Sequence, residues 1–240
     1  MLWHIPVSHY SEKARWALDH KHIGHARRAP LLGSHQLVAL ALTRGAVGTF
    51  PVLRIDGRNV GDSTAVLAAL EARYPERPLY PADPPERARA LALEDFFDEE
   101  LGPHIRLFAY HQLMADRRGF TRFAERMAPA ALRRAAGPLA RAMVSVRFRA
   151  NDATRATAAG EKVLAALDRL EVELGDREYL VGGAFSVADL TAASLFYPLV
   201  APPEGPLIPP PAEGLERFRD PLRERRGYRW VREMFARHRR

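Results

Sequence analysis

Two serines near the N-terminus have the type and the position to take part in chemistry. The sequence predicts a helix over residues 11–21. Ser8 stands just before this helix, and Ser11 is its first residue. A helix N-terminus carries N–H groups without intrahelical partners and a partial positive charge, so it favours an anion such as a thiolate. A hydroxyl that donates a hydrogen bond favours the thiolate further. We interpret Ser8 as the thiolate-stabilising residue. Ser11 is its rival because it is nearer the expected helix start, and plain capping by Ser8 is the alternative.

The chain contains no cysteine, which excludes disulfides, zinc–thiolate sites and a protein thiol nucleophile. Ser8 and Ser11 have the spacing of a C-x-x-C motif without its sulfurs, so disulfide exchange through this chain is excluded as well. The neighbouring His20, His22 and His25 lack an accompanying carboxylate or fourth ligand, and we expect no metal site.

A second candidate site is Asp62-Ser63, just before a helix predicted over residues 64–74. Ser63 and the helix N-terminus suit a carboxylate, and the Asp62 side chain suits an ammonium group. Simple helix capping explains the same residues, and capping and binding can coexist.

The first third of the chain has the pattern of an α/β domain. Asp56-Gly57 between two apolar-containing runs is typical of a β-hairpin turn. The expected elements are strand 2–5, helix 11–21, a weak strand 26–32, a short helix 34–44, strands 51–55 and 58–60, and helix 64–74.

Beyond residue 85 the pattern is helical. Five prolines in residues 75–85 indicate a linker, which predicts an α/β domain over 1–80 and an all-α domain over 86–240. Ser186 and Asp189 have the spacing of a capping box, flanked by Phe185 and Leu190 as a hydrophobic staple. The expected helical segments cover residues 86–118, 120–149, 154–174 and 215–238. Gly102-Pro103 should kink the first segment, and Gly119 and Pro129 should divide the second stretch. A Pro-rich loop over 201–214 precedes the last helix.

Positive charge is concentrated in two stretches of a 240-residue chain whose formal net charge is +7. Residues 115–150 hold nine Arg and two acids, and residues 216–240 hold ten Arg and four acids. We interpret them as solvated helical surface, with nucleic acid, anionic lipid or an acidic substrate as alternatives. Nucleic acid is not expected, because aromatic residues do not alternate with the arginines. We also expect no signal peptide, no membrane span and a cytoplasmic location.

Four segments in order resemble the glutathione S-transferase superfamily. They are SHYSEKARWAL over residues 8–18, GTFPVL over 48–53, GDSTAVL over 61–67, and Tyr74-Pro75 with PLYP over 78–81. The capping motif at 186–189 fits the same superfamily, whereas residues 100–175 agree only in being helical. The resemblance implies a thioredoxin-like N-terminal domain followed by a helical bundle, with a serine-type active site.

The resemblance also implies a binding mode for glutathione as cosubstrate. A cis Phe50-Pro51 bond would leave the Phe50 backbone free to hold the cysteinyl part, and Asp62-Ser63 would hold the γ-glutamyl end. The glycyl carboxylate needs a cation, for which His35 and Arg44 are the candidates. Another low-molecular-weight thiol in place of glutathione stays open.

The second substrate is then expected between the domains, against Phe108, Tyr110, His111 and Met114. An alternative is that these residues are simply core. The implied function is addition of the activated thiolate to a small hydrophobic electrophile, by a homodimer. The rival hypothesis is a non-catalytic protein of the same fold that binds hydrophobic ligands or acts as an interaction module.

Overall fold

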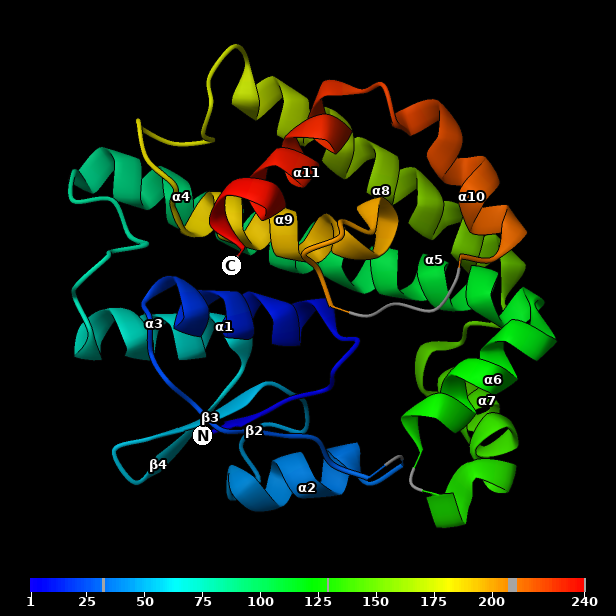
Figure 1. Cartoon of the computed structure of the whole chain (residues 1–240). Coiled ribbons are helices and arrows are strands. Elements are labelled where there is room, and N and C mark those ends of the chain that lie inside the picture. Colours follow the sequence, from blue (N-terminus) through cyan, green and yellow to red (C-terminus); the bar gives the residue numbers. More distant parts are fainter. Residues whose placement is uncertain (32, 129, 207–210, 240) are drawn as a thin grey trace.

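A computed structural model describes residues 1–31, 33–128, 130–206 and 211–239. A small mixed sheet with three helices is followed by a larger helical domain, as the sequence predicts (Figure 1). The exact domain bounds, 1–80 and 86–240, remain a prediction. No helix among these described residues is long and apolar enough to cross a membrane.

The sheet has four strands in the order β2-β1-β3-β4. Strand β1 pairs in parallel with β2 and antiparallel with β3, and β3 pairs antiparallel with β4. Asp56 and Gly57 both have positive φ, at 46° and 79°, which is the signature of a type I′ hairpin turn and confirms the predicted hairpin. The strands are β1 (Leu2–Trp3), β2 (Arg27–Arg28), β3 (Val52–Ile55) and β4 (Arg58–Gly61).

Helices α1 (His9–His20) and α3 (Ser63–Arg73) lie between the sheet and the helical domain, and α2 (His35–Leu42) lies on the opposite side of the sheet (Figure 1). The apolar side chains of α1 and α3 join the main core, with Trp16 and Leu67 fully buried. Helix α1 begins at His9, two residues earlier than predicted, because Ser8 and not Ser11 caps it.

The helical domain is built around α9 (Val187–Val200), whose residues are almost all buried. The predicted capping box at its start is confirmed: the Asp189 carboxylate accepts from the Ser186 N–H and from the Leu180 N–H, each at 2.8 Å. The other α-helices described in this domain are α4 (Pro84–Phe96), α5 (Gly102–Ala115), α6 (Arg117–Met127), α7 (Arg133–Phe148), α8 (Ala153–Leu174), α10 (Glu213–Arg219) and α11 (Arg226–His238).

Three of the predicted long helices are interrupted. A π-helical turn, η1 (Phe97–Leu101), joins α4 to α5 at the expected kink, and a 3-10 turn, η2 (Ala130–Leu132), precedes α7. The last predicted helix is split by a 3-10 turn, η3 (Asp220–Leu222), because Pro221 cannot continue an α-helical ladder. Of the predicted Pro-rich loop, residues 207–210 lie outside the described part of the chain, and helix α10 already begins at Glu213.

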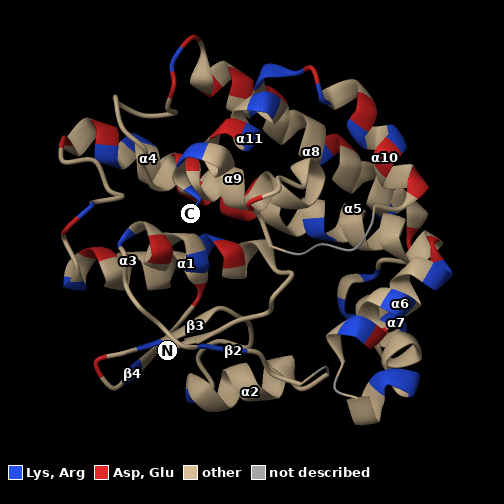
Figure 2. Cartoon of the chain, viewed as in Figure 1, with Lys and Arg blue, Asp and Glu red and all other residues tan. Residues whose placement is uncertain are grey.

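The two basic stretches differ in how their charges are compensated. In the C-terminal stretch, Arg219, Arg223 and Arg225 form ion pairs with carboxylates of α8, α10 and η3. In the 115–150 stretch the described ion pairs include only Arg149 with Asp152, at 4.0 Å. Figure 2 shows the resulting blue clusters on α6 and α7.

Candidate functional site

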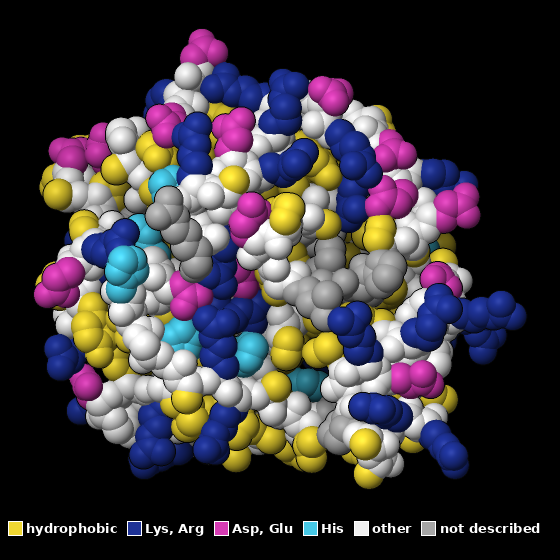
Figure 3. Space-filling model, viewed as in Figure 1, with side chains coloured by type: hydrophobic (Ala, Val, Ile, Leu, Met, Phe, Trp, Pro, Cys, Tyr) yellow, Lys and Arg dark blue, Asp and Glu magenta, His cyan; other side chains and the backbone are white. Residues whose placement is uncertain are grey.

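A cleft with a volume of about 850 Å³ opens between the two domains. One side is formed by the starts of α1, α2 and α3 together with residues 48–51, and the other by α5, α6 and α7. Figure 3 shows hydrophobic side chains between the N-terminal domain and the lobe that α6 and α7 form. The wall that α5, α6 and α7 form is largely apolar, whereas the helix starts of the N-terminal domain bring polar groups such as Ser8 and Asp62 to the cleft.

Ser8 lines this cleft as the N-cap of α1. Its hydroxyl oxygen accepts a hydrogen bond from the Ser11 N–H at 3.3 Å, and no described residue accepts the hydroxyl proton. The following N–H groups, of His9 and Tyr10, have no intrahelical acceptor because they belong to the first turn. Ser8 thus presents a free O–H beside the positive end of a helix.

Contacts with the helical domain fix the first turn of α1. The buried His9 ring donates from Nε2 to the Gly102 carbonyl at 3.0 Å, and the Tyr10 hydroxyl donates to the Asp98 carbonyl at 2.7 Å. Burial lowers the pKa of His9 to about 3, so its ring stays neutral and needs only this one acceptor. Pro103 lacks a backbone N–H and cannot donate to a carbonyl of the preceding η1 turn. The Asp98 carbonyl is therefore free to accept from the Tyr10 hydroxyl.

Ser11 lies in the core below this turn. It is fully buried, and its hydroxyl accepts the Ile5 N–H at 3.1 Å. Ser11 does not line the cleft, whereas Ser8 does. The two serines therefore differ in access, which the sequence did not reveal.

The Phe50-Pro51 bond is cis, as the resemblance implies. Phe50 and Pro51 both line the cleft, and Pro51 immediately precedes strand β3. None of the described backbone hydrogen bonds outside the helices and strands uses Phe50. Its N–H and carbonyl are thus available to an extended ligand.

Asp62 and Ser63 form the start of α3 and also line the cleft. Asp62 caps the helix through one oxygen, Oδ1, which accepts from the N–H groups of Thr64 and Ala65 at 2.9 and 3.3 Å. Its φ of 75° is in a region that non-glycine residues avoid, and such strain is found mainly at functional sites. The second oxygen, Oδ2, accepts no described hydrogen bond and could meet an ammonium group.

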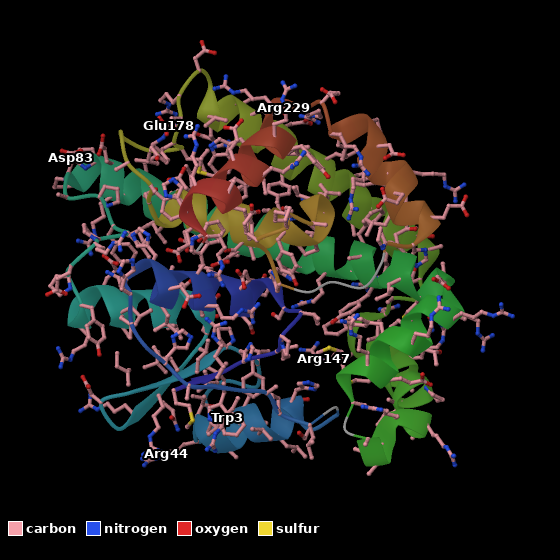
Figure 4. The ribbon with its side chains drawn as sticks, viewed as in Figure 1. Trp3, Arg44, Asp83, Arg147, Glu178 and Arg229 are labelled. Atoms are coloured by element: carbon pink, nitrogen blue, oxygen red, sulfur yellow. The ribbon has the colours of Figure 1, made fainter. Side chains whose placement is uncertain are left out.

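The start of α2 reaches the same cleft through His35 and Gln36. Ser34 makes no side-chain cap, so the first N–H groups of α2 are open to an anion. Burial lowers the pKa of the His35 imidazole, which favours its neutral form. Arg44 lies at the far end of α2, away from the cleft-lining residues, at the lower edge of Figure 4.

Of the residues expected to line a second-substrate pocket, Tyr110 lines the cleft, and Phe108, His111 and Met114 do not. The reason is helical geometry, because α5 turns only one face towards the cleft. Phe108 packs against Phe218 with ring centroids 4.4 Å apart, and His111 donates to the Ala150 carbonyl at 2.8 Å.

Sequence reasoning missed most of the apolar wall. These residues belong to α5, α6 and α7, and apolar residues at helical spacing were the only signal for them: Leu113, Phe120, Phe123, Met127, Met143 and Phe148. It also missed Arg106 and Arg147, which line the same wall.

Comparisons with known proteins agree with this arrangement. Residues 2–78 match the family model of the glutathione S-transferase N-terminal domain, and residues 122–225 match that of the C-terminal domain. No curated protein sequence matches the chain.

Solved structures with the same fold include three bacterial glutathione S-transferases. The enzyme from Xanthobacter autotrophicus is 18% identical, with a TM-score of 0.65 and coverage of 98% of this chain and 92% of that one. A theta-class enzyme from Xanthomonas axonopodis pv. citri, with glutathione bound, is 24% identical, with a TM-score of 0.59 and coverage of 96% and 95%. The enzyme from Methylobacterium radiotolerans, in complex with glutathione sulfonate, is 22% identical, with a TM-score of 0.58 and coverage of 95% and 92%.

Both halves of the chain thus match the two domain families in order, and the mixed sheet, the cis Phe50-Pro51 step and the helical domain fit them. The chain belongs to the glutathione S-transferase superfamily.

Proposed function

We propose that this protein is a glutathione-dependent transferase in which Ser8 stabilises the glutathione thiolate. The observation that carries the proposal is the free Ser8 hydroxyl at the open N-terminus of α1, inside the cleft. A thiol with an ordinary pKa of about 8.5 is only about 3% ionised at pH 7. A donated hydrogen bond together with the helix field favours the anion and raises that fraction.

The rest of the tripeptide has matching groups along the N-terminal side of the cleft. The free backbone groups of Phe50, beside Pro51, suit the cysteinyl part. Asp62 Oδ2 and the N-terminus of α3 at Ser63 suit the α-ammonium and α-carboxylate of the γ-glutamyl end. The open start of α2 at His35 suits the glycyl carboxylate, through its N–H groups rather than through an imidazolium. Glutathione bound to one solved neighbour and glutathione sulfonate bound to another support this cosubstrate, and another low-molecular-weight thiol in its place is the alternative.

The apolar wall of the cleft suits a small hydrophobic electrophile. In the reaction a sulfur–carbon bond forms, and the electron pair leaves with a displaced group such as halide. The protein contributes thiolate stabilisation and proximity. A cytoplasmic homodimer remains our prediction, on the analogy of the family.

The test is Ser8→Ala, compared with Ser8→Thr, which keeps both hydroxyl and helix cap. Ser8→Ala should raise the pKa of bound glutathione, followed by thiolate absorbance, because the stabilised form is the anion. Loss of a hydrogen bond to a charged group predicts a roughly ten- to hundredfold fall in kcat/KM at neutral pH, partly restored near about pH 9.

Glutathione affinity should change much less, since Phe50 and Asp62 hold other parts of the tripeptide. Ser8→Ala also removes the helix cap, which costs about 0.5–2 kcal/mol of stability. Thermal unfolding measures this loss of stability independently of the catalytic effect. An unchanged thiol pKa in Ser8→Ala would contradict the proposed role. Retention on immobilised glutathione without turnover of any electrophile would favour the alternative, a binding protein of the same fold.

A further inference from the structure

An arginine without an anionic partner lies in the apolar half of the cleft. Arg106 projects from α5, is half-buried, and lines the cleft with Ala109, Tyr110 and Leu113. Its Nε is fully buried and has no hydrogen-bond partner, and none of the ion pairs among the described residues includes Arg106. None of the described hydrogen bonds or ion pairs uses the Nη groups of Arg106 either. A guanidinium that is half-buried without a partner is costly, and an anion at its Nη groups would offset that cost.

Aromatic rings hold this guanidinium in place. Its central carbon lies 4.8 Å from the Phe148 ring centroid and 5.9 Å from that of Tyr10. Phe148 in turn stacks on Tyr110 with centroids 5.1 Å apart. The N–H donors lie in the plane of the guanidinium, and the two Nη groups have no partner among the described residues, so they can meet a planar anion.

A second cation accompanies Arg106. Arg147 of α7 lines the same cleft, and its guanidinium carbon lies 5.4 Å from the Phe148 centroid. Figure 4 shows Arg147 in the space between the N-terminal domain and α7. Burial, and to a smaller degree Arg147, lower the pKa of Arg106, which fits two like charges facing one site.

The carboxylates of the cleft do not neutralise this pair. Asp98 is engaged by Lys13 and Thr64, and Asp62 caps α3. Asp95 and Glu99 also line the cleft, and neither forms a described ion pair with Arg106 or Arg147. None of the described ion pairs includes Arg147. The cleft thus has an acidic end at the glutathione side and an uncompensated basic end on the apolar wall.

We propose that Arg106, assisted by Arg147, binds a carboxylate of the second substrate, so that the protein prefers hydrophobic electrophiles that carry an acidic group. The aromatic part of such a substrate lies on the apolar wall, and its acid meets the Arg106 fork. This inference rests on the proposed transferase function and narrows its substrate class.

The experiment compares two nitro-activated aryl chlorides of the same substitution pattern, a negatively charged chloronitrobenzoate and a neutral chloronitrobenzamide, each kcat/KM being divided by the rate constant of the uncatalysed reaction with glutathione. Wild-type protein should have the higher kcat/KM for the acid. Arg106→Gln should lower the acid-to-amide ratio of kcat/KM roughly ten- to hundredfold, as expected for a lost charge-assisted hydrogen bond. Arg106→Lys keeps the charge without the planar fork and should recover part of the ratio.

The matched control is Arg155→Gln, an exposed arginine of α8 outside the cleft, which should leave the ratio unchanged. An equal fall for acid and amide in Arg106→Gln would overturn the proposal, because it would mean a structural role or an effect on glutathione.

Calorimetric binding of unreactive nitrobenzoate and nitrobenzamide separates this inference from the proposed function. Suppose that the wild type binds the acid more tightly than the amide, that Arg106→Gln loses this preference, and that neither chloride is turned over. That result would support the anion site and refute the transferase function. Equal affinity for acid and amide in the wild type would refute the anion site, whatever the turnover.

Discussion

At the scale of single residues, several histidines are held neutral inside the protein. Burial is the main cause that lowers the pKa of His9 to about 3 and the pKa values of His4 and His20 to about 4, and nearby arginines lower them further. An unfolded chain has histidine pKa values near about 6.5. Between the folded and the unfolded pKa values, the unfolded state binds protons that the folded state does not. The contribution of these histidines to the free energy of unfolding is therefore complete above about pH 6.5 and is lost as the pH falls.

We therefore expect the free energy of unfolding to fall between about pH 6.5 and pH 4, by about 1.4 kcal/mol per pH unit for each such histidine. Urea unfolding at a series of pH values measures the slope. His9→Gln keeps a donor for the Gly102 carbonyl but cannot take up a proton. Its free energy of unfolding should therefore fall less steeply with pH than that of the wild type, by the contribution of one histidine. A slope identical to that of the wild type would show that His9 is not held neutral.

At the scale of elements, the junction of α4 and α5 holds the first turn of α1 in place. The η1 turn leaves the Asp98 carbonyl to the Tyr10 hydroxyl, and Gly102 leaves room for that hydroxyl. A Cβ at Gly102 would lie 2.0 Å from Tyr10 Oη and 2.5 Å from its Cζ. The glycine is needed here for close approach, because its φ is −54° and any residue could adopt it.

Gly102→Ala should therefore destabilise the protein by about 1–3 kcal/mol, as overpacking does, although alanine normally stabilises a helix relative to glycine. The pKa of bound glutathione should rise as well, because the first turn of α1 is displaced from the cleft. Chemical denaturation and thiolate titration measure the two effects. Gly24→Ala is the control, since no heavy atom lies within 4 Å of its added Cβ. Equal stability of the two variants would refute the steric argument.

At the scale of the whole molecule, a buried ionic cluster joins the two domains. Lys13 of α1 is completely buried and pairs with Glu94 of α4 at 2.8 Å and with Asp98 of the η1 turn. Thr64 of α3 donates to the same Asp98 carboxylate at 2.7 Å. Burial raises the pKa of Glu94, and the charge of Lys13 opposes that rise. Removal of one partner would leave the others charged and desolvated.

Lys13→Met should lower the free energy of unfolding by about 3–5 kcal/mol. The double variant Lys13→Met with Glu94→Leu removes one of the stranded carboxylates and should recover part of that loss. Equilibrium unfolding of wild type, both single variants and the double variant gives the coupling energy. Strict additivity of the two substitutions would show that the pair is not coupled.

Local sequence patterns determined much of this protein. Asp56-Gly57 fixed a hairpin because its two positive φ values suit few other residue pairs, and Ser186 with Asp189 fixed the start of α9 through bonds three residues apart. The order of the elements followed from the same kind of short-range signal. Phe50 and His35 on the polar side of the cleft followed only from the resemblance to the superfamily.

Only the tertiary structure decided which serine is accessible and which face of α5 meets the cleft. Ser11 is buried within the first turn of α1, and that turn contacts Asp98 and Gly102, which lie some ninety residues away in the chain. Arg106 and Phe148 meet because α7 folds back on α5. Such contacts depend on how helices pack, and helical periodicity alone defines faces without saying what each face will meet.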